Sequence, residues 1–108
     1  MERRLMIIKI KPEYREKYID LHLNPWDEIL VVTKEAGFRS EIIWYYNNLS
    51  IIYFETEDDY FECDKRLMEM ETSKKWEHIV NEWFEEKPIL AEKIFDLNQM
   101  LQGKMDKY

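Results

Sequence analysis

Two apolar and aromatic runs in the middle of the chain are separated by a single Asn-Asn pair. The runs are residues 41–46 and 49–55. β-Branched and aromatic residues favour strands, and Asn47 and Asn48 tolerate the positive φ that a tight hairpin turn requires. The pattern predicts a β-hairpin, so two antiparallel strands must lie side by side at the centre of the fold.

Helical and strand patterns flank this hairpin on both sides. Apolar runs and hydrophobic spacing distinguish strands from helices, and prolines and capping residues mark their ends. The expected elements are a strand at 5–11, helical segments at 13–22 and 25–35, the hairpin, a helix whose cap is Thr56, an amphipathic helix at 76–84 and a last strand at 90–97. Residues 98–108 form a polar tail, helical or frayed.

The order of these elements is βαββαβ, which predicts one domain over residues 1–108. An antiparallel hairpin between two βα units is the ferredoxin-like split arrangement, an α+β fold with helices on one face of an antiparallel sheet. The strand at 41–46 is apolar on both of its sides. Because an uncovered apolar sheet face indicates a partner, we expect a homodimer that packs sheet on sheet, a dimeric α+β barrel.

The charge of the chain limits its partners. It has 16 basic and 23 acidic residues, a net charge of −7, and no basic run longer than a pair. Such a surface repels phosphate backbones, so neither nucleic acid nor an anionic membrane is expected as a partner. The apolar run at 5–8 is too short for a signal peptide or a membrane span, and Cys63 is alone, which favours a reducing compartment. We expect a cytoplasmic protein.

No pattern for a metal or cofactor is recognisable. The sequence has no zinc or calcium-loop spacing, and its two glycines cannot form a phosphate-binding loop. His78 and Glu82 have the spacing of a helical metal pair, but an exposed ion pair is the commoner meaning of such a spacing. We therefore expect neither a metal nor a cofactor.

Tyr18, His22 and Trp26 recur every four residues. On a helix this spacing stacks three side chains along one face. Histidine exchanges protons near neutral pH because its ordinary pKa is about 6.5. An imidazole between two aromatic rings can stack on a sugar and move a proton. The other interpretation is a helix-surface histidine with packing aromatics around it.

The chain resembles the L-rhamnose mutarotase family, in which a helix carries a Tyr four residues before a His and then a Trp. Tyr18, His22, Trp26 and Glu28 are in step with that pattern, although Asn24-Pro25 stands one place late. The resemblance implies a ferredoxin-like fold, His22 as the catalytic acid of anomer exchange, and a monosaccharide substrate. It also implies that Tyr18, Trp26 and Trp76 bind the sugar.

Two positions depart from the family pattern. Four residues after Gly37, where the family has a Tyr that contacts sugar, this chain has Glu41. Where the family has a Trp-Trp pair, this chain has Trp76 followed by Glu77. We expect Glu41 to belong to the substrate site and the preferred sugar to be L-rhamnose or a related deoxy sugar.

Two other functions fit the same pattern. One is a non-catalytic dimeric domain that binds a small molecule in the same pocket, and the other is an oxidative enzyme of the dimeric-barrel type. An accessible His22 beside Tyr18 favours the mutarotase. A His22 buried against backbone carbonyls favours the binding domain.

Overall fold

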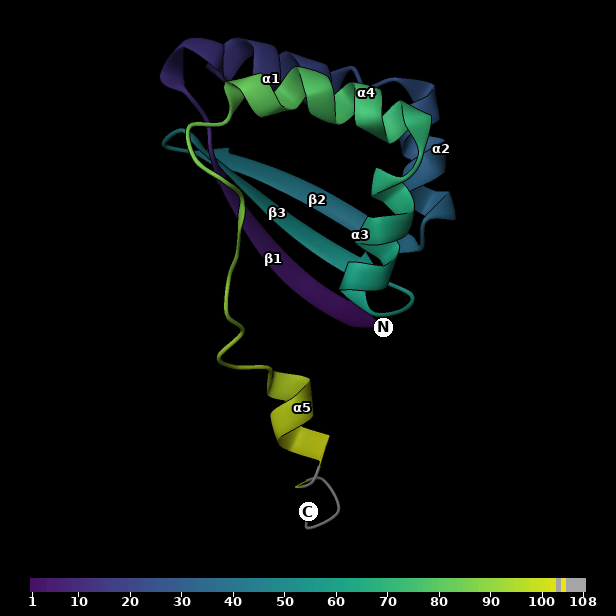
Figure 1. Ribbon diagram of the computed structural model, residues 1–108. Coiled ribbons are helices and arrows are strands. Elements are labelled where there is room, and N and C mark those ends of the chain that lie inside the picture. The colour runs from purple at the N-terminus through teal and green to yellow at the C-terminus, as the bar shows by residue number, and fades with distance from the viewer. Residues whose placement is uncertain (103, 105–108) are drawn as a thin grey trace.

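Four antiparallel strands form one sheet in the order β2-β3-β1-β4 (Figure 1). The computed structural model describes residues 1–102 and 104 of the 108-residue chain. The strands are β1 (Glu2–Lys9), β2 (Phe38–Tyr46), β3 (Leu49–Thr56) and β4 (Ile89–Leu90). β3 lies between β1 and β2, as the split arrangement requires, and the predicted ferredoxin-like α+β fold is confirmed.

Helices fill both crossovers and lie on one face of the sheet (Figure 1). The first crossover has the short 3-10 turn η1 (Pro12–Tyr14), α1 (Arg15–Leu23) and α2 (Asp27–Glu35). The second has α3 (Tyr60–Met68), α4 (Glu71–Val80) and the 3-10 turn η2 (Asn81–Trp83). A short helix, α5 (Leu97–Gln102), follows the sheet and stands apart from it (Figure 1).

The predicted hairpin is confirmed. β2 and β3 pair antiparallel across Asn47 and Asn48, which have φ angles of 50° and 59°. Gly37, after α2, has φ of +110°, and a Cβ placed there would lie 2.8 Å from the Cys63 Sγ. Both conformations are costly for most other residues, so these three residues fix where the chain turns.

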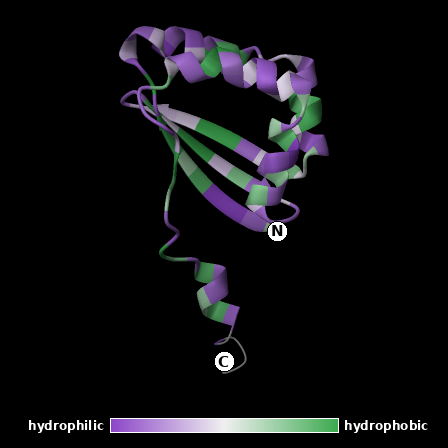
Figure 2. Cartoon of the chain, viewed as in Figure 1, coloured by the Kyte–Doolittle hydropathy of each residue, from purple (hydrophilic) through white to green (hydrophobic). Residues whose placement is uncertain are grey.

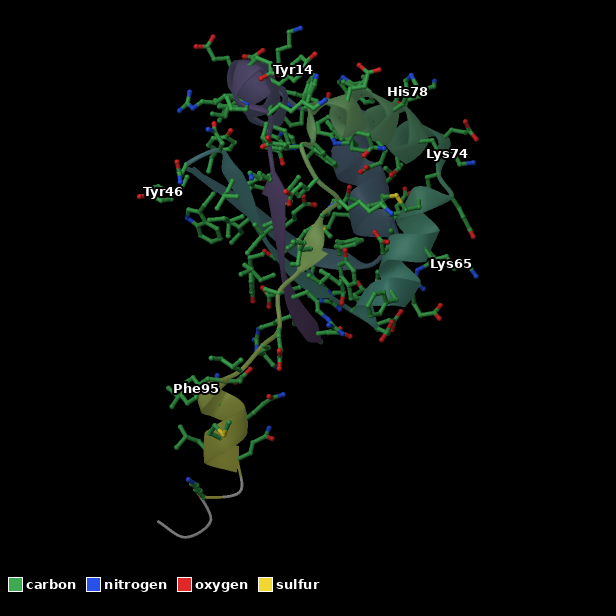
Figure 3. The ribbon with its side chains drawn as sticks, turned by 60° about the vertical axis from the view of Figure 1, so that its left-hand side comes forward. Tyr14, Tyr46, Lys65, Lys74, His78 and Phe95 are labelled. Carbon is green, nitrogen blue, oxygen red and sulfur yellow. The ribbon has the colours of Figure 1, made fainter. Side chains whose placement is uncertain are left out.

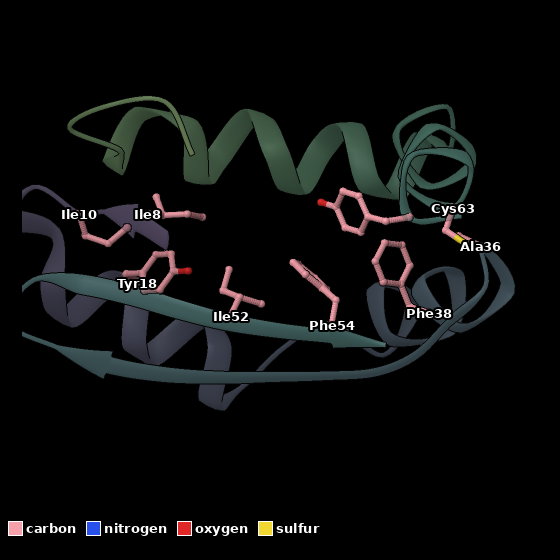
Figure 4. Close-up of a cluster of buried hydrophobic side chains, with 9 residues drawn as sticks. Ile8, Ile10, Tyr18, Ala36, Phe38, Ile52, Phe54 and Cys63 are labelled. Atoms are coloured by element: carbon pink, nitrogen blue, oxygen red, sulfur yellow. The ribbon is translucent and has the colours of Figure 1, made fainter. Parts of the chain in front are cut away.

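The core lies between the sheet and the helices (Figure 4). Every second residue of β3 points into it, so that Ser50, Ile52, Phe54 and Thr56 are all buried. Phe54 contacts two further rings there, with ring centroids 5.4 Å from Phe38 and 5.5 Å from Tyr60. Strand alternation therefore gives the sheet one buried face and leaves the other face open.

The helix expected after Thr56 begins later than its predicted cap. Asp59 is the N-cap of α3, and its carboxylate accepts hydrogen bonds from the backbone N–H groups of Phe61 and Glu62, at 2.9 and 3.2 Å. Thr56 is instead the last residue of β3, where it pairs with Phe38. Thr56 therefore pairs within the sheet and does not cap the helix that the local sequence pattern predicted.

The last strand predicted at 90–97 is wrong over most of its length. β4 ends at Leu90, and only one further backbone bond, from Ala91 N to Leu5 O at 2.8 Å, follows β1. Continuing the register would place Lys93 opposite Arg3, and like charges facing each other destabilise a sheet. Lys93 instead contacts Asp96, with N···O 3.5 Å. Part of the tail predicted at 98–108 is helical in α5, and residues 103 and 105–108 lie outside the described part.

The open face of the sheet is apolar. In the strand register Trp44 lies opposite Ile51, Ile51 opposite Ile7, and Ile7 opposite Ile89. Paired residues share a face, so this row crosses all four strands. Apolar residues are frequent along the strands (Figure 2), and Tyr46 projects from the end of the hairpin (Figure 3). The described helices include none that is both long and apolar enough to cross a membrane.

Candidate functional site

A pocket of about 740 Å³ lies between the sheet and the helix layer. Its walls come from β1, β2 and β3 on one side and from the helices of both crossovers on the other. Four of the five predicted site residues line it, namely Tyr18, His22, Glu41 and Trp76. The hairpin and both crossovers therefore contribute side chains to one cavity.

His22 is in the last turn of α1, and its ring is held in one orientation. Nδ1 lies 2.7 Å from the carbonyl oxygen of Tyr18, so Nδ1 carries the hydrogen and donates it. Burial lowers the pKa of His22 below its ordinary 6.5, and the bond to Tyr18 partly opposes this shift. The imidazole is therefore neutral near pH 7, and Nε2 carries the lone pair.

The Tyr18 ring packs against the His22 ring. The two rings lie with centroids 4.2 Å apart, and the Tyr18 hydroxyl is 2.6 Å from the Ser50 hydroxyl of β3. Tyr18 is 3% exposed, and burial raises its pKa to about 12, against the opposing effect of the Ser50 bond. Its ring points into the space between sheet and helices (Figure 4).

Two tryptophans follow His22 in a chain of edge contacts. The Trp76 ring of α4 lies 5.3 Å from His22 at 86°, and Trp26 lies 5.2 Å from Trp76 at 88°. Trp26 is not among the side chains that line the pocket. It is also not on the helix of Tyr18 and His22, because α1 ends at Leu23 and Trp26 is the extended N-cap of α2. Trp26 therefore reaches the site only by packing on Trp76.

A β-bulge turns Glu41 toward the pocket. The register of β2 on β3 shifts between Phe38 and Ser40, after which Glu41 lies opposite Phe54. Phe54 is on the buried face, and directly paired residues share a face. Without the extra residue of the bulge, Glu41 would point to the open face. The sequence could not indicate this, because one inserted residue reverses the orientation of every later side chain.

Glu41 lies on the helix-covered face of the sheet and lines the cavity, and it remains exposed to water. Burial raises the pKa of Glu41 to about 7, and the neighbouring Glu77 carboxylate adds to the rise. Burial also raises the pKa of Glu77, with a further contribution from Asp64. All three carboxyl groups line the pocket. Asp64 had no signal in the sequence, because α3 reads as an ordinary amphipathic helix.

Metal ligands are not gathered at this site. Among the residues that the structure describes, no group of three or more His, Cys, Asp or Glu side chains could hold a metal ion. His78 points away from the body of the protein (Figure 3), and Glu82 lies beyond the end of α4 in η2. The side chains that line the pocket include an imidazole, aromatic rings and carboxyl groups.

A protein-family comparison decides which family this pocket belongs to. The family model described as L-rhamnose mutarotase matches residues 3–102. The chain belongs to the L-rhamnose mutarotase family. This confirms the resemblance found in the sequence, and it makes the protein a member of a family of enzymes that act on sugars.

Solved structures support the mutarotase fold. The L-rhamnose mutarotase of Formosa agariphila has a TM-score of 0.73 and 19% identity, and the match covers 89% of this chain and 98% of that one. An antibiotic biosynthesis monooxygenase has a TM-score of 0.62 and 14% identity, covering 88% and 100%. A dimeric ferredoxin-like protein from an uncultured marine organism has 0.57 and 13%, covering 87% and 91%.

At these identities, structural likeness establishes the fold and not the activity. The monooxygenase neighbour therefore gives no support to the oxidative alternative, whereas the family match is made on the sequence itself. No curated protein matches the chain by sequence. The mutarotase family membership rests on the match over residues 3–102.

The raised pKa of Glu41 predicts a pH-dependent loss of stability. Its ordinary pKa is 4.5, and in the folded protein it is about 7. Between these values the unfolded chain has released a proton that the folded protein still binds, so stability falls as pH rises through this window. Glu41→Gln cannot titrate. We expect it to exceed the wild type in free energy of unfolding by about 1 kcal/mol above pH 7, less than the full pKa difference because pocket water screens the charge.

Urea unfolding monitored by circular dichroism at a series of pH values measures this difference. The matched control is Glu69→Gln, since Glu69 is exposed at the end of α3 and does not line the pocket. Equal pH profiles for Glu41→Gln and the wild type would contradict the prediction.

Proposed function

We propose that the protein is a sugar mutarotase that interconverts the α and β anomers of L-rhamnose or a related deoxy sugar. The observation that carries this proposal is the state of His22. Its Nδ1–H is donated to the Tyr18 carbonyl at 2.7 Å, and the ring lines a pocket large enough for a monosaccharide. This arrangement leaves Nε2 as a fixed proton acceptor inside the cavity.

Anomer exchange needs one proton to move between two oxygens on the same carbon. His22 Nε2 accepts the proton of the anomeric hydroxyl, and the imidazolium then donates a proton to the ring oxygen. The bond between the anomeric carbon and the ring oxygen breaks, and an open-chain aldehyde forms. Rotation of the aldehyde and the reverse proton transfers close the ring on the other face. The imidazole ends neutral, so the cycle balances without a cofactor.

The required rate enhancement is within reach of one histidine. A positioned acid or base contributes roughly 10²–10⁴-fold, which is about 3–5 kcal/mol of barrier. Spontaneous mutarotation in water already occurs, so no larger effect is needed. We propose that Trp76 stacks on the sugar, that Trp26 holds Trp76 in place, and that Tyr18 orients His22 through its ring and carbonyl.

Replacing His22 by alanine should remove the acceleration of anomer exchange and leave the fold intact. His22 is only partly buried, so its loss opens a small gap at the pocket wall. The measurement is saturation-transfer NMR on L-rhamnose and related deoxy sugars, with circular dichroism to check the fold. We expect a fall of about 10²-fold or more.

His78→Ala is the matched control, because His78 is the other histidine of the chain and is exposed on α4. It should exchange anomers at the wild-type rate. A His22→Ala variant with the wild-type rate would rule out His22 as the proton-transfer group. Retained sugar binding without exchange in the wild type would favour a non-catalytic binding domain.

The rate of anomer exchange should fall at acidic pH in one step, which reports the protonation of His22. The cycle begins with neutral imidazole, and burial keeps the pKa of His22 below 6.5. The accelerated rate should therefore be steady near pH 7 and fall as the pH drops below that lowered pKa. If the cycle instead began with imidazolium, the rate would rise in the acidic range. The Glu41→Gln variant should keep this fall at acidic pH, which separates the two titrations.

We propose that the protein is a homodimer formed through the open sheet face. The apolar row there includes Trp44, which is 54% exposed, and Ile89, which is 58% exposed. The segment after β4 adds Ile94 and Phe95, which are 86% and 63% exposed. An apolar surface of this kind calls for a cover, and a second copy offers the same surface about a two-fold axis. The dimeric ferredoxin-like neighbour supports this choice.

Sedimentation velocity at micromolar concentration should show a dimer. Trp44→Glu, at the β2 end of the row, should shift the protein toward monomer because it places a charge in the interface. Val31→Glu is the control, since Val31 is equally exposed, at 55%, on the helix side in α2. A wild-type protein that sediments as a monomer would show that this face is left open in solution.

A further inference from the structure

We infer that the preferred sugar of this pocket carries a positively charged amino group. The inference rests on the proposed function for its sugar part, and on the charges inside the pocket for its cationic part. Glu41 of β2, Asp64 of α3 and Glu77 of α4 all line the same cavity as His22. Three elements that are far apart in the sequence thus bring acidic groups to one site.

None of these three carboxyl groups has a protein partner in the described part of the chain. Their side chains form no hydrogen bond and no ion pair with a described residue. The bulge points Glu41 into the cavity, where it stays exposed to water. Charges of one sign that line a cleft with low-dielectric walls create a potential there that attracts ligands of the opposite sign. The pocket therefore favours a positively charged ligand.

The basic side chains that line the pocket bond to other groups and not to these three carboxyl groups. The Lys34 ammonium donates a hydrogen bond to the carbonyl oxygen of Arg39 at 2.9 Å. The Arg39 guanidinium is paired with Glu57, with N···O 3.0 Å. Lys34 and Arg39 are the basic side chains among the pocket residues besides His22, and His22 is neutral near pH 7. The basic side chains of the pocket thus leave these carboxyl groups unpaired, and a cationic ligand would supply the counter-charge.

An ammonium group fits this environment better than a hydroxyl does. A neutral sugar hydroxyl can donate one hydrogen bond to a carboxylate, but the negative charges then stay uncompensated. An ammonium donates up to three hydrogen bonds and neutralises charge at the same time. Trp76 and Tyr60 also line the cavity, and aromatic faces attract cations. An amino-deoxy sugar keeps the anomeric centre that His22 acts on and supplies the missing charge.

Binding of such a sugar should depend on pH through Glu41. Its pKa of about 7, raised by burial and by Glu77, means that it is protonated in mild acid and offers no charge there. The other titratable or charged groups that line the pocket are Tyr18, His22, Lys34, Arg39, Tyr45, Tyr60, Asp64 and Glu77. The preference for an ammonium should therefore be large at about pH 7 and weak at about pH 5.

The experiment is isothermal titration calorimetry with matched sets of sugars. Each set contains a 3-amino or 4-amino hexose or 6-deoxyhexose, its parent with a hydroxyl at that position, and its N-acetyl derivative. We expect at least one amino sugar to bind about 10-fold or more tightly than both counterparts at about pH 7. The ratio should shrink at about pH 5, where the amine keeps its charge and Glu41 does not.

Variants assign the preference to the carboxyl groups. Glu41→Gln and Glu77→Gln should each reduce the ratio of amino sugar to parent affinity several-fold, and Glu69→Gln, outside the pocket, should leave it unchanged. Glu41→Tyr should shift the preference toward L-rhamnose, since it replaces a charge by a ring and a neutral hydroxyl. Circular dichroism confirms that each variant is folded.

Equal or weaker binding of every amino sugar, including the absence of detectable binding, overturns the inference. Exchange of L-rhamnose anomers that depends on His22 would then still stand as the function. The opposite result is also distinguishable. Tight binding of an amino sugar without any anomer exchange would support the inference and contradict the proposed mutarotase.

Discussion

The hydrogen bond between the hydroxyls of Tyr18 and Ser50, 2.6 Å long, ties the helix layer to the central part of the sheet. Both groups are almost completely buried, so each satisfies the other where water is excluded. The same Tyr18 carries the ring under His22 and the carbonyl that orients it. The same residue therefore serves both core packing and the site. The direction in which His22 Nε2 points depends on how Tyr18 attaches α1 to β3.

The features that the sequence predicted well are those decided by a few adjacent residues. The hairpin follows from two asparagines between apolar runs, and His22 and Tyr18 meet because four residues make about one helical turn. The family pattern pointed to Trp76, and this side chain lines the pocket. Trp26 was assigned to the same helix face, but Asn24-Pro25 ends α1 first. Trp26 does not line the pocket, but its ring packs against Trp76, which does.

The features that the sequence could not predict depend on tertiary register. Glu41 enters the pocket through a single extra residue between Phe38 and Ser40, and no local pattern marks that insertion. The strand expected at 90–97 stops at Leu90, because its continuation would face the charged end of β1. Ile94 and Phe95 are apolar residues of the kind that is common in strands. The same residues are also common on surfaces that a partner covers, so their presence alone does not identify a strand.

The proposed reaction and the proposed specificity are located on different layers of the fold. His22, the proposed proton-transfer group, is in α1 and is oriented by its own helix and by β3, whereas Glu41 is on β2 and reaches the same cavity from the sheet. A change at position 41 therefore alters the charge around the sugar without moving the imidazole. Because Glu77 follows Trp76 on α4, the stacking surface and the second carboxyl group enter from one helix turn. On the proposed function, the pocket keeps one reaction while the charge at position 41 sets its preferred sugar, so charge inside the cavity is a better guide to the substrate than the fold is.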